Sequence, residues 1–98
     1  MIKTDFFITV RDNGKTTARK VTGYYEYMAG LPIGLHKVTN NVWNATELST
    51  GLMIATDYTR AGALNKAVNM ADLVLKHLNN DKFVSARDRI SEAYKGGR

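Results

Sequence analysis

The feature of this sequence that most restricts its fold is an apolar stripe at helical spacing in the second half. Its members recur at intervals of three or four residues, or lie beside those that do: Leu64, Ala67, Val68, Ala71, Val74, Leu75 and Leu78. This pattern predicts an amphipathic helix of about 20 residues. Thr59 and its neighbours offer side-chain oxygens that can cap the start of this helix, and Asn79 and Asn80 are expected to end it. Such a stripe needs a flat apolar surface to pack against.

The first 27 residues are expected to supply part of that surface as a β-hairpin. Phe6 to Val10 are β-branched or aromatic, as is typical of a strand. Asn13-Gly14 favours a type I′ turn, because both central residues of that turn need a positive φ. The expected cross-strand pairs are Phe6 with Val21, Ile8 with Arg19 and Val10 with Thr17. The second strand should then continue into Tyr24–Tyr27.

The region after Tyr27 is expected to form three more strands. Gly30, Pro32 and Gly34 predict a break over residues 28–34. Strands are then expected at residues 35–39, 42–48 and 52–55, separated by short turns. Strands this close in sequence pair antiparallel, since parallel partners need long crossovers. Asp81 is expected to cap a second helix, which should end at Gly96-Gly97.

Together these elements predict an α+β fold in a single domain, residues 1–98. An antiparallel sheet of about five strands, made of the hairpin and the three-stranded meander, packs against the long helix. The shorter C-terminal helix docks at an edge or end of the sheet, or projects toward a partner. Trp43 is expected in or beside the core.

The composition excludes several classes of protein. The chain is 44% hydrophobic and 23% charged, which argues against a disordered chain, and it contains no Cys and therefore no disulfide. It has no apolar run long enough to cross a membrane and no pattern typical of a signal peptide. We therefore expect a cytoplasmic protein, located in the host cytoplasm if the chain is encoded by a phage.

The sequence contains no pattern that indicates catalysis. Its two imidazoles, His36 and His77, lie in different expected elements without a cluster of further ligands, so no metal and no cofactor are expected. His36 is expected to be a surface or half-buried residue. The serines lack the setting of an activated nucleophile, and the carboxylates are scattered along the chain. The chain is therefore not expected to be an enzyme.

Three tyrosines close behind two bases are the first candidate binding feature. Tyr24, Tyr25 and Tyr27 follow Arg19 and Lys20. Tyrosine gives large contact area at low entropy cost, and cations beside it can steer and pair with an acidic partner, which suits a protein interface. Aromatic rings beside cations also suit stacking on single-stranded nucleic acid. A third interpretation places alternate tyrosines in the core and the others at the rim of the sheet.

The basic residues are the second candidate feature. The net charge is +5, and the bases concentrate in the first 23 and the last 40 residues. A direct contact with DNA or RNA would use basic side chains of the β-hairpin and of the C-terminal helix: Arg11, Lys15, Arg19, Lys20, Arg87 and Arg89. Arg87 and Arg89 do not share a helix face, and acidic neighbours such as Glu92 favour a solvated surface of mixed charge.

One segment carries a resemblance to known proteins. The stretch from Trp43 to Leu52, followed by Thr59-Arg60, resembles the arm-binding domain of tyrosine recombinases. It also resembles small accessory proteins of phages and prophages, some of which inhibit host defence nucleases. A sheet that reads DNA needs Lys or Arg side chains that face the phosphates. Residues 24–58 contain one such residue, Lys37. The resemblance to phage accessory proteins is therefore the one that we follow.

Three hypotheses follow from these features. The first is a non-enzymatic binding protein that occupies a surface of a macromolecular partner, in the manner of an anti-CRISPR-like inhibitor of a nucleic-acid-handling or defence enzyme. Its contacts would be Arg19, Lys20, Tyr24, Tyr25 and Tyr27. The second is a protein that binds DNA or RNA directly through the basic hairpin. The third, compatible with both, is a homo-oligomer.

Overall fold

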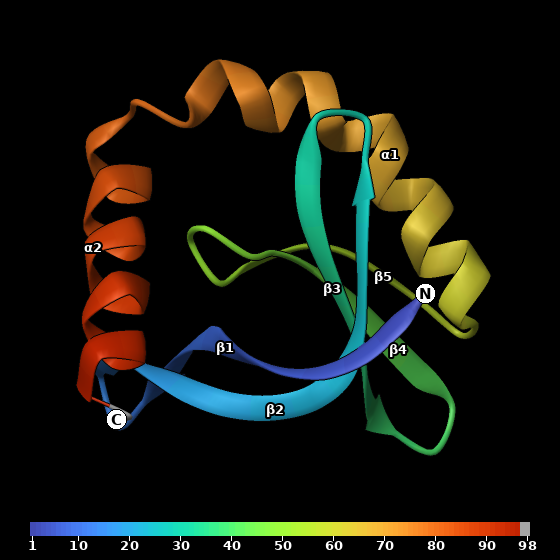
Figure 1. Ribbon diagram of the computed structural model, residues 1–98, viewed down its shortest axis with the longest axis horizontal. Helices are drawn as coiled ribbons and strands as arrows, with labels where there is room; N and C mark the ends of the chain where they lie inside the picture. The colour runs from blue at the N-terminus through green and yellow to red at the C-terminus, as the bar shows by residue number, and fades with distance from the viewer. Residues whose placement is uncertain (97–98) are drawn as a thin grey trace.

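The computed structural model describes residues 1–96 and contains five strands followed by two helices. These elements are β1 (Ile2–Asp12), β2 (Lys15–Met28), β3 (Leu31–Thr39), β4 (Val42–Glu47), β5 (Leu52–Asp57), α1 (Arg60–His77) and α2 (Asp81–Gly96). The strands form one antiparallel sheet in the order β1-β2-β3-β4-β5, with the helices around it (Figure 1). The expected α+β fold is confirmed.

The hairpin of β1 and β2 has the expected register. Phe6 pairs with Val21, Ile8 with Arg19 and Val10 with Thr17. Asn13 and Gly14 both have positive φ, at 51° and 79°, as a type I′ turn requires. The register matters for function because it decides which hairpin side chains share a face.

The break expected over residues 28–34 is wrong. β2 ends at Met28 and β3 begins at Leu31, joined by Ala29 and Gly30, whose φ angles are 57° and 83°. Pro32 is tolerated because the ladder between β3 and β4 reaches only as far as Ile33, and its carbonyl still accepts a hydrogen bond from the Leu48 amide at 2.9 Å. The strand is therefore continuous through Pro32 and Gly34.

Helix α1 forms the main core against β3, β4 and β5. The buried residues of this core are Leu31, Ile33, Leu35, Ala45, Ala63, Leu64, Ala67, Ala71 and Val74. Thr59 caps the helix, its hydroxyl accepting from the Gly62 amide at 2.9 Å. Leu75, expected in the buried stripe, is 42% exposed, because the helix turns its small side chains Ala63, Ala67 and Ala71 toward the sheet.

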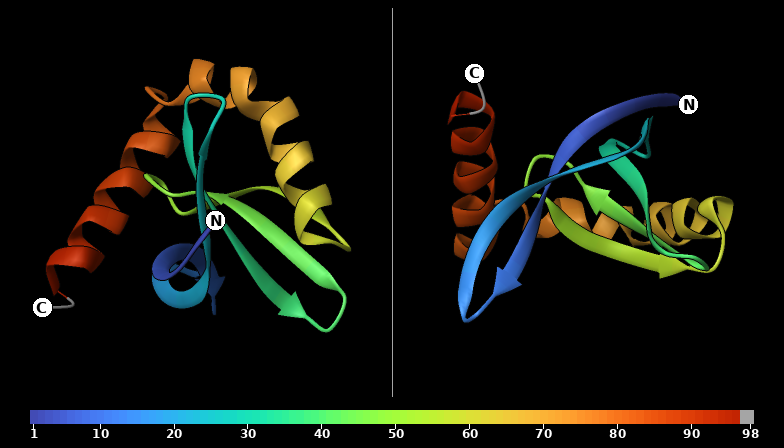
Figure 2. Two further views of the ribbon diagram at one scale, coloured as in Figure 1. Left: turned by 45° about the vertical axis from the view of Figure 1, so that its right-hand side comes forward. Right: turned by 90° about the horizontal axis from the view of Figure 1, so that it is seen from below.

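The sheet is strongly curled, and both helices lie on its outer side (Figure 2). Helix α2 packs against the hairpin, where the Tyr94 and Phe7 rings meet edge to face with centroids 4.9 Å apart. The docking of the second helix at an end of the sheet is therefore confirmed. The Thr9 amide donates to the Gly51 carbonyl at 2.7 Å, so β1 also touches the turn between β4 and β5. The inner face of the curled sheet is left without a covering helix.

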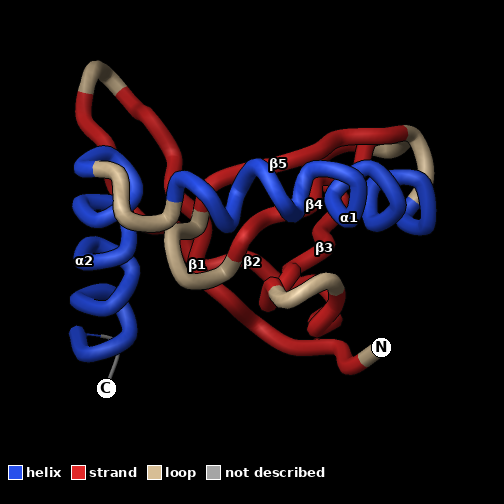
Figure 3. Tube along the Cα trace, turned by 90° about the horizontal axis from the view of Figure 1, so that it is seen from above, coloured by secondary structure: helices blue, strands red, loops and turns tan. Residues whose placement is uncertain are grey.

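The two helices are joined by a short turn (Figure 3). The Asn80 side chain accepts from the Lys82 amide at 2.9 Å, so Asn80 rather than Asp81 caps α2, and Asp81 is its first residue. Gly96 is the last residue of α2, and Gly97 lies outside the described residues. Neither helix of the described chain is long and apolar enough to cross a membrane.

Candidate functional site

Strand alternation divides the expected partner-binding residues between two faces. β2 pairs without a bulge along its whole length, so successive side chains point to opposite sides. Arg19, Tyr25 and Tyr27 belong to the inner face, whereas Lys20 and Tyr24 belong to the outer face. The structure therefore does not bring the three tyrosines together in one patch.

Tyr24 takes part in a group of rings and cations on the outer face. Its ring centroid lies 6.3 Å from that of Trp43. The Arg60 guanidinium carbon lies 4.4 Å from the Tyr24 centroid and 5.9 Å from the Trp43 centroid, and the Lys37 amine lies 6.0 Å from the Trp43 centroid. We call these four residues, Tyr24, Lys37, Trp43 and Arg60, the outer aromatic cluster.

Sheet register and the start of α1 place these four side chains together. Trp43 pairs with Lys37 on one side and with Asp57 on the other, and Arg60 opens α1 three residues after Asp57. Trp43 packs beside the core, as expected from the sequence. The cluster therefore draws on β2, β3, β4 and the first turn of α1.

Within residues 1–96, no ion pair neutralises the charge of the cluster. Asp57, the nearest acid in the sheet, is paired with Lys66 at 3.8 Å. Neither Lys37 nor Arg60 forms an ion pair with any carboxylate of residues 1–96. Tyr58, which lies between Asp57 and Arg60 in the sequence, is exposed. The result is a positively charged aromatic surface.

Sequence reasoning named Tyr24 but missed Lys37 and Arg60. The missing information was the pairing of β2 with β3, which brings Tyr24 opposite Leu35 and so onto the same face as Trp43. The false break over residues 28–34 hid that pairing. A cation at the first residue of the helix was visible in the sequence, but its position over two rings depends on the fold.

The basic residues expected to contact nucleic acid lie on different faces of the protein. Alternation places Lys15 and Arg19 on the inner face of the hairpin, and Arg11 and Lys20 on its outer face. The Lys20 amine lies 5.8 Å from the Phe7 ring centroid. Arg87 and Arg89, on α2, are both half-buried. These six bases form no single surface.

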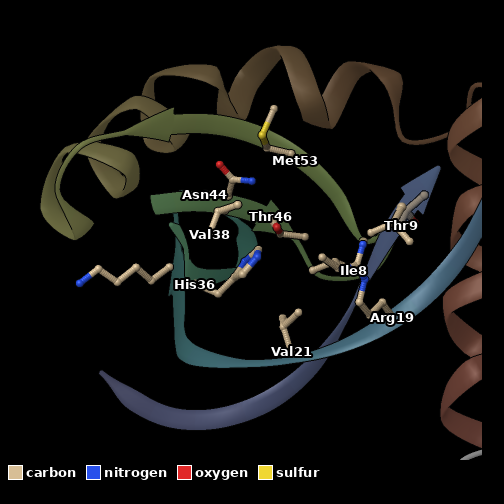
Figure 4. Close-up of a pocket in the computed structure, with 12 residues that line it drawn as sticks. Ile8, Thr9, Arg19, Val21, His36, Val38, Asn44, Thr46 and Met53 are labelled. Atoms are coloured by element: carbon tan, nitrogen blue, oxygen red, sulfur yellow. The ribbon is translucent and has the colours of Figure 1, made fainter. Parts of the chain in front are cut away.

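The inner face of the sheet holds a second candidate site, a pocket of about 400 Å³. Figure 4 shows side chains of four labelled residues, Ile8, Val21, His36 and Thr46, around it, with the sheet wrapped about the space and the helices outside. Phe6 fills the adjoining part of this face, where a Cβ on Gly34 would lie 2.7 Å from its ring. Arg19 brings a cation to the same pocket.

His36 is buried, at 7% exposure, which corrects the expectation of a surface or half-buried residue. The curl of the sheet is the cause, because it brings the Phe6 ring edge-on to the imidazole with centroids 6.0 Å apart. Nδ1 of His36 has no hydrogen-bond partner among the described residues. Burial, and secondarily the charge of Arg19, lower the pKa of His36 below its ordinary value.

Within the described part of the chain, no group of three or more His, Asp or Glu side chains is arranged to hold a metal ion. Comparisons with protein-family models, with curated proteins and with solved structures gave no match to this chain.

Proposed function

We propose that this chain is a non-enzymatic binding protein that uses the outer aromatic cluster to occupy a surface of a macromolecular partner. The observation that carries the proposal is the pair of cations, Lys37 and Arg60, held against Tyr24 and Trp43 without an ion-pair partner among the described residues. Trp, Tyr and Arg are the residues most enriched among interface positions that dominate binding energy. Rings that fix the cations in place also reduce the entropy lost on association.

The charge of the cluster favours a protein partner with an acidic surface. Two cations without ion pairs attract carboxylates and accelerate encounter. Arg60 covers one face of Tyr24, so a nucleic-acid base could stack on that face only by displacing the guanidinium. This arrangement supports a protein partner over a base-stacking platform.

The class of partner is inferred from the resemblance to small phage and prophage accessory proteins. By that resemblance the partner is a nucleic-acid-handling or defence enzyme of the host, and the chain inhibits it by covering a working surface. The chain would then need no chemistry of its own.

The proposal is tested by capture of partners from cells that encode the chain, with matched charge variants as bait. The bait K37A/R60A removes both cations of the cluster. The control K76A/K82A removes the same charge from exposed positions on the helices. We expect K37A/R60A to capture at least tenfold less of the partner that the wild type enriches, and the control to capture it fully, because rings without their cations lose the charged part of the contact.

Three other results would each contradict the proposal. Equal capture by all baits would exclude the cluster as the interface. Loss of all capture after nuclease treatment, with direct DNA or RNA binding that weakens steeply with salt, would support the alternative of a nucleic-acid-binding protein. Light scattering at two concentrations that gave a dimer, with no other partner captured, would make a second copy the partner.

A further inference from the structure

The pocket on the inner face of the sheet has the composition of a small-molecule site. Its volume of about 400 Å³ falls in the range of sites that hold small ligands. Aliphatic side chains from three strands form its walls, with Ile8 from β1, Val21 from β2 and Val38 from β3. Val38 is half exposed, so the pocket is open to solvent on that side.

The polar end of this pocket has a buried group without a partner. His36 is more than nine-tenths buried, and its ring lies in the pocket (Figure 4). Its Nδ1 makes no hydrogen bond within residues 1–96. Because Nδ1 has almost no accessible surface, a ligand in the pocket would meet the His36 ring rather than this atom.

A cation also lines this pocket. Arg19 lines the pocket, is exposed, and acts electrostatically on His36. No carboxylate in the described residues forms an ion pair with it. Its neighbours across the sheet and along the strand, Ile8, Thr17 and Val21, are uncharged. A guanidinium in such a setting is suited to a carboxylate, which it can bind through two parallel hydrogen bonds.

We propose that this pocket binds a small amphipathic carboxylate, with its apolar tail against Ile8 and Val21 and its carboxylate paired with Arg19. The Arg19 guanidinium would supply both the charge and the hydrogen bonds to the carboxylate. An acyl chain of medium length suits the size of the pocket. This proposal does not rest on the proposed function, because Ile8, Arg19 and Val21 lie on the inner face of the sheet, although Lys37 of the outer aromatic cluster also lines the pocket.

The test is a titration of the isotope-labelled protein with octanoate, followed by NMR of the methyl groups and the histidine rings. We expect shifts at Ile8, Val21, Val38 and the His36 ring that saturate with added octanoate. Octanol has the apolar tail without the negative charge, and inorganic phosphate has the charge without the tail. Each should bind at least tenfold more weakly than octanoate. Octanol binding as tightly as octanoate would overturn the role of the charge, and phosphate binding as tightly would overturn the role of the tail.

Two variants test the polar end. R19Q keeps most of the side-chain length and removes the positive charge. V38E adds a negative charge, which repels the carboxylate of octanoate, at a half-exposed position of the pocket. Each should weaken octanoate at least tenfold and change octanol less than twofold. The control K20Q, on the next residue but the outer face, should bind octanoate as the wild type does. Unchanged affinity in both R19Q and V38E, or octanoate shifts confined to other residues, would overturn the proposal.

Discussion

At the scale of single residues, His36 differs most from what its position in the sequence suggests. It lies between Leu35 and Lys37 in a strand, and this local sequence does not predict that its side chain is buried. Its burial depends on Phe6, thirty residues earlier, which is brought over it by the curl of the sheet. Long-range contacts of this kind are not visible in local patterns, so this pocket residue was given no role from the sequence.

The lowered pKa of His36 makes stability depend on pH with a defined sign. An unfolded histidine takes up a proton near pH 6.5, whereas folded His36 stays neutral to lower pH. Stability from this group is therefore present above pH 6.5 and is lost as pH falls toward the folded-state pKa, with a slope of at most about 1.4 kcal/mol per pH unit. Urea denaturation between pH 7.5 and 5.5 measures it.

Two histidine variants separate this effect from other titrations. H36Q should remove the loss of stability between pH 6.5 and 5.5 that His36 causes, because no imidazole remains to be protonated on unfolding. H77Q, at an exposed position of α1, should retain the wild-type slope. A slope in H36Q equal to that of the wild type would mean that His36 is not held neutral by its surroundings.

At the scale of elements, prediction succeeded where the turn chemistry was explicit. Asn13-Gly14 is a strong turn signal, and the hairpin formed with the expected register. The second tight turn, Ala29-Gly30, was missed because alanine rarely adopts the left-handed conformation that it has here. The glycines and the proline beyond that turn then suggested a long loop, and with β3 shortened the contact between Tyr24 and Trp43 could not be derived.

The left-handed Ala29 offers a test of this explanation. The substitution Ala29→Asn should raise the free energy of unfolding by about 0.5–1 kcal/mol, because asparagine tolerates a φ near 57° better than alanine does. The same substitution at exposed Ala61, in the first turn of α1, should give no gain, since a helical residue does not need that tolerance. A stability of A29N at or below that of the wild type, measured by urea denaturation, would contradict the account.

At the scale of the whole molecule, the curl of the sheet creates two separate surfaces. The helices pack on the outside, and the inner face curves around a pocket. Close approach of neighbouring strands permits this curl. A Cβ on Gly23 would strike the Leu35 carbonyl oxygen, and one on Gly34 would strike Phe6 and Leu48. A side chain at Gly23 would force β2 and β3 apart, and one at Gly34 would displace the Phe6 and Leu48 side chains.

The sequence predicted the strands, the helices and their layering, but not the curl. Apolar residues occur on both faces of the hairpin, with Phe6 and Ile8 on one and Phe7 on the other, so the pattern did not say which face a helix would cover. The second helix covers the Phe7 face through Tyr94. The face that carries Ile8, Arg19 and Val21 was thereby left to line a pocket.

The central claim is that a macromolecular partner contacts the outer aromatic cluster, and site-specific photo-crosslinking tests it most directly. A photoreactive phenylalanine would replace one exposed tyrosine at a time: Tyr58, 76% exposed and two residues before Arg60, Tyr27, 63% exposed, or Tyr94, 49% exposed on α2. The account predicts that the captured partner crosslinks to position 58 and not to positions 27 or 94. Crosslinks at position 27 or 94, with none at position 58, would contradict it.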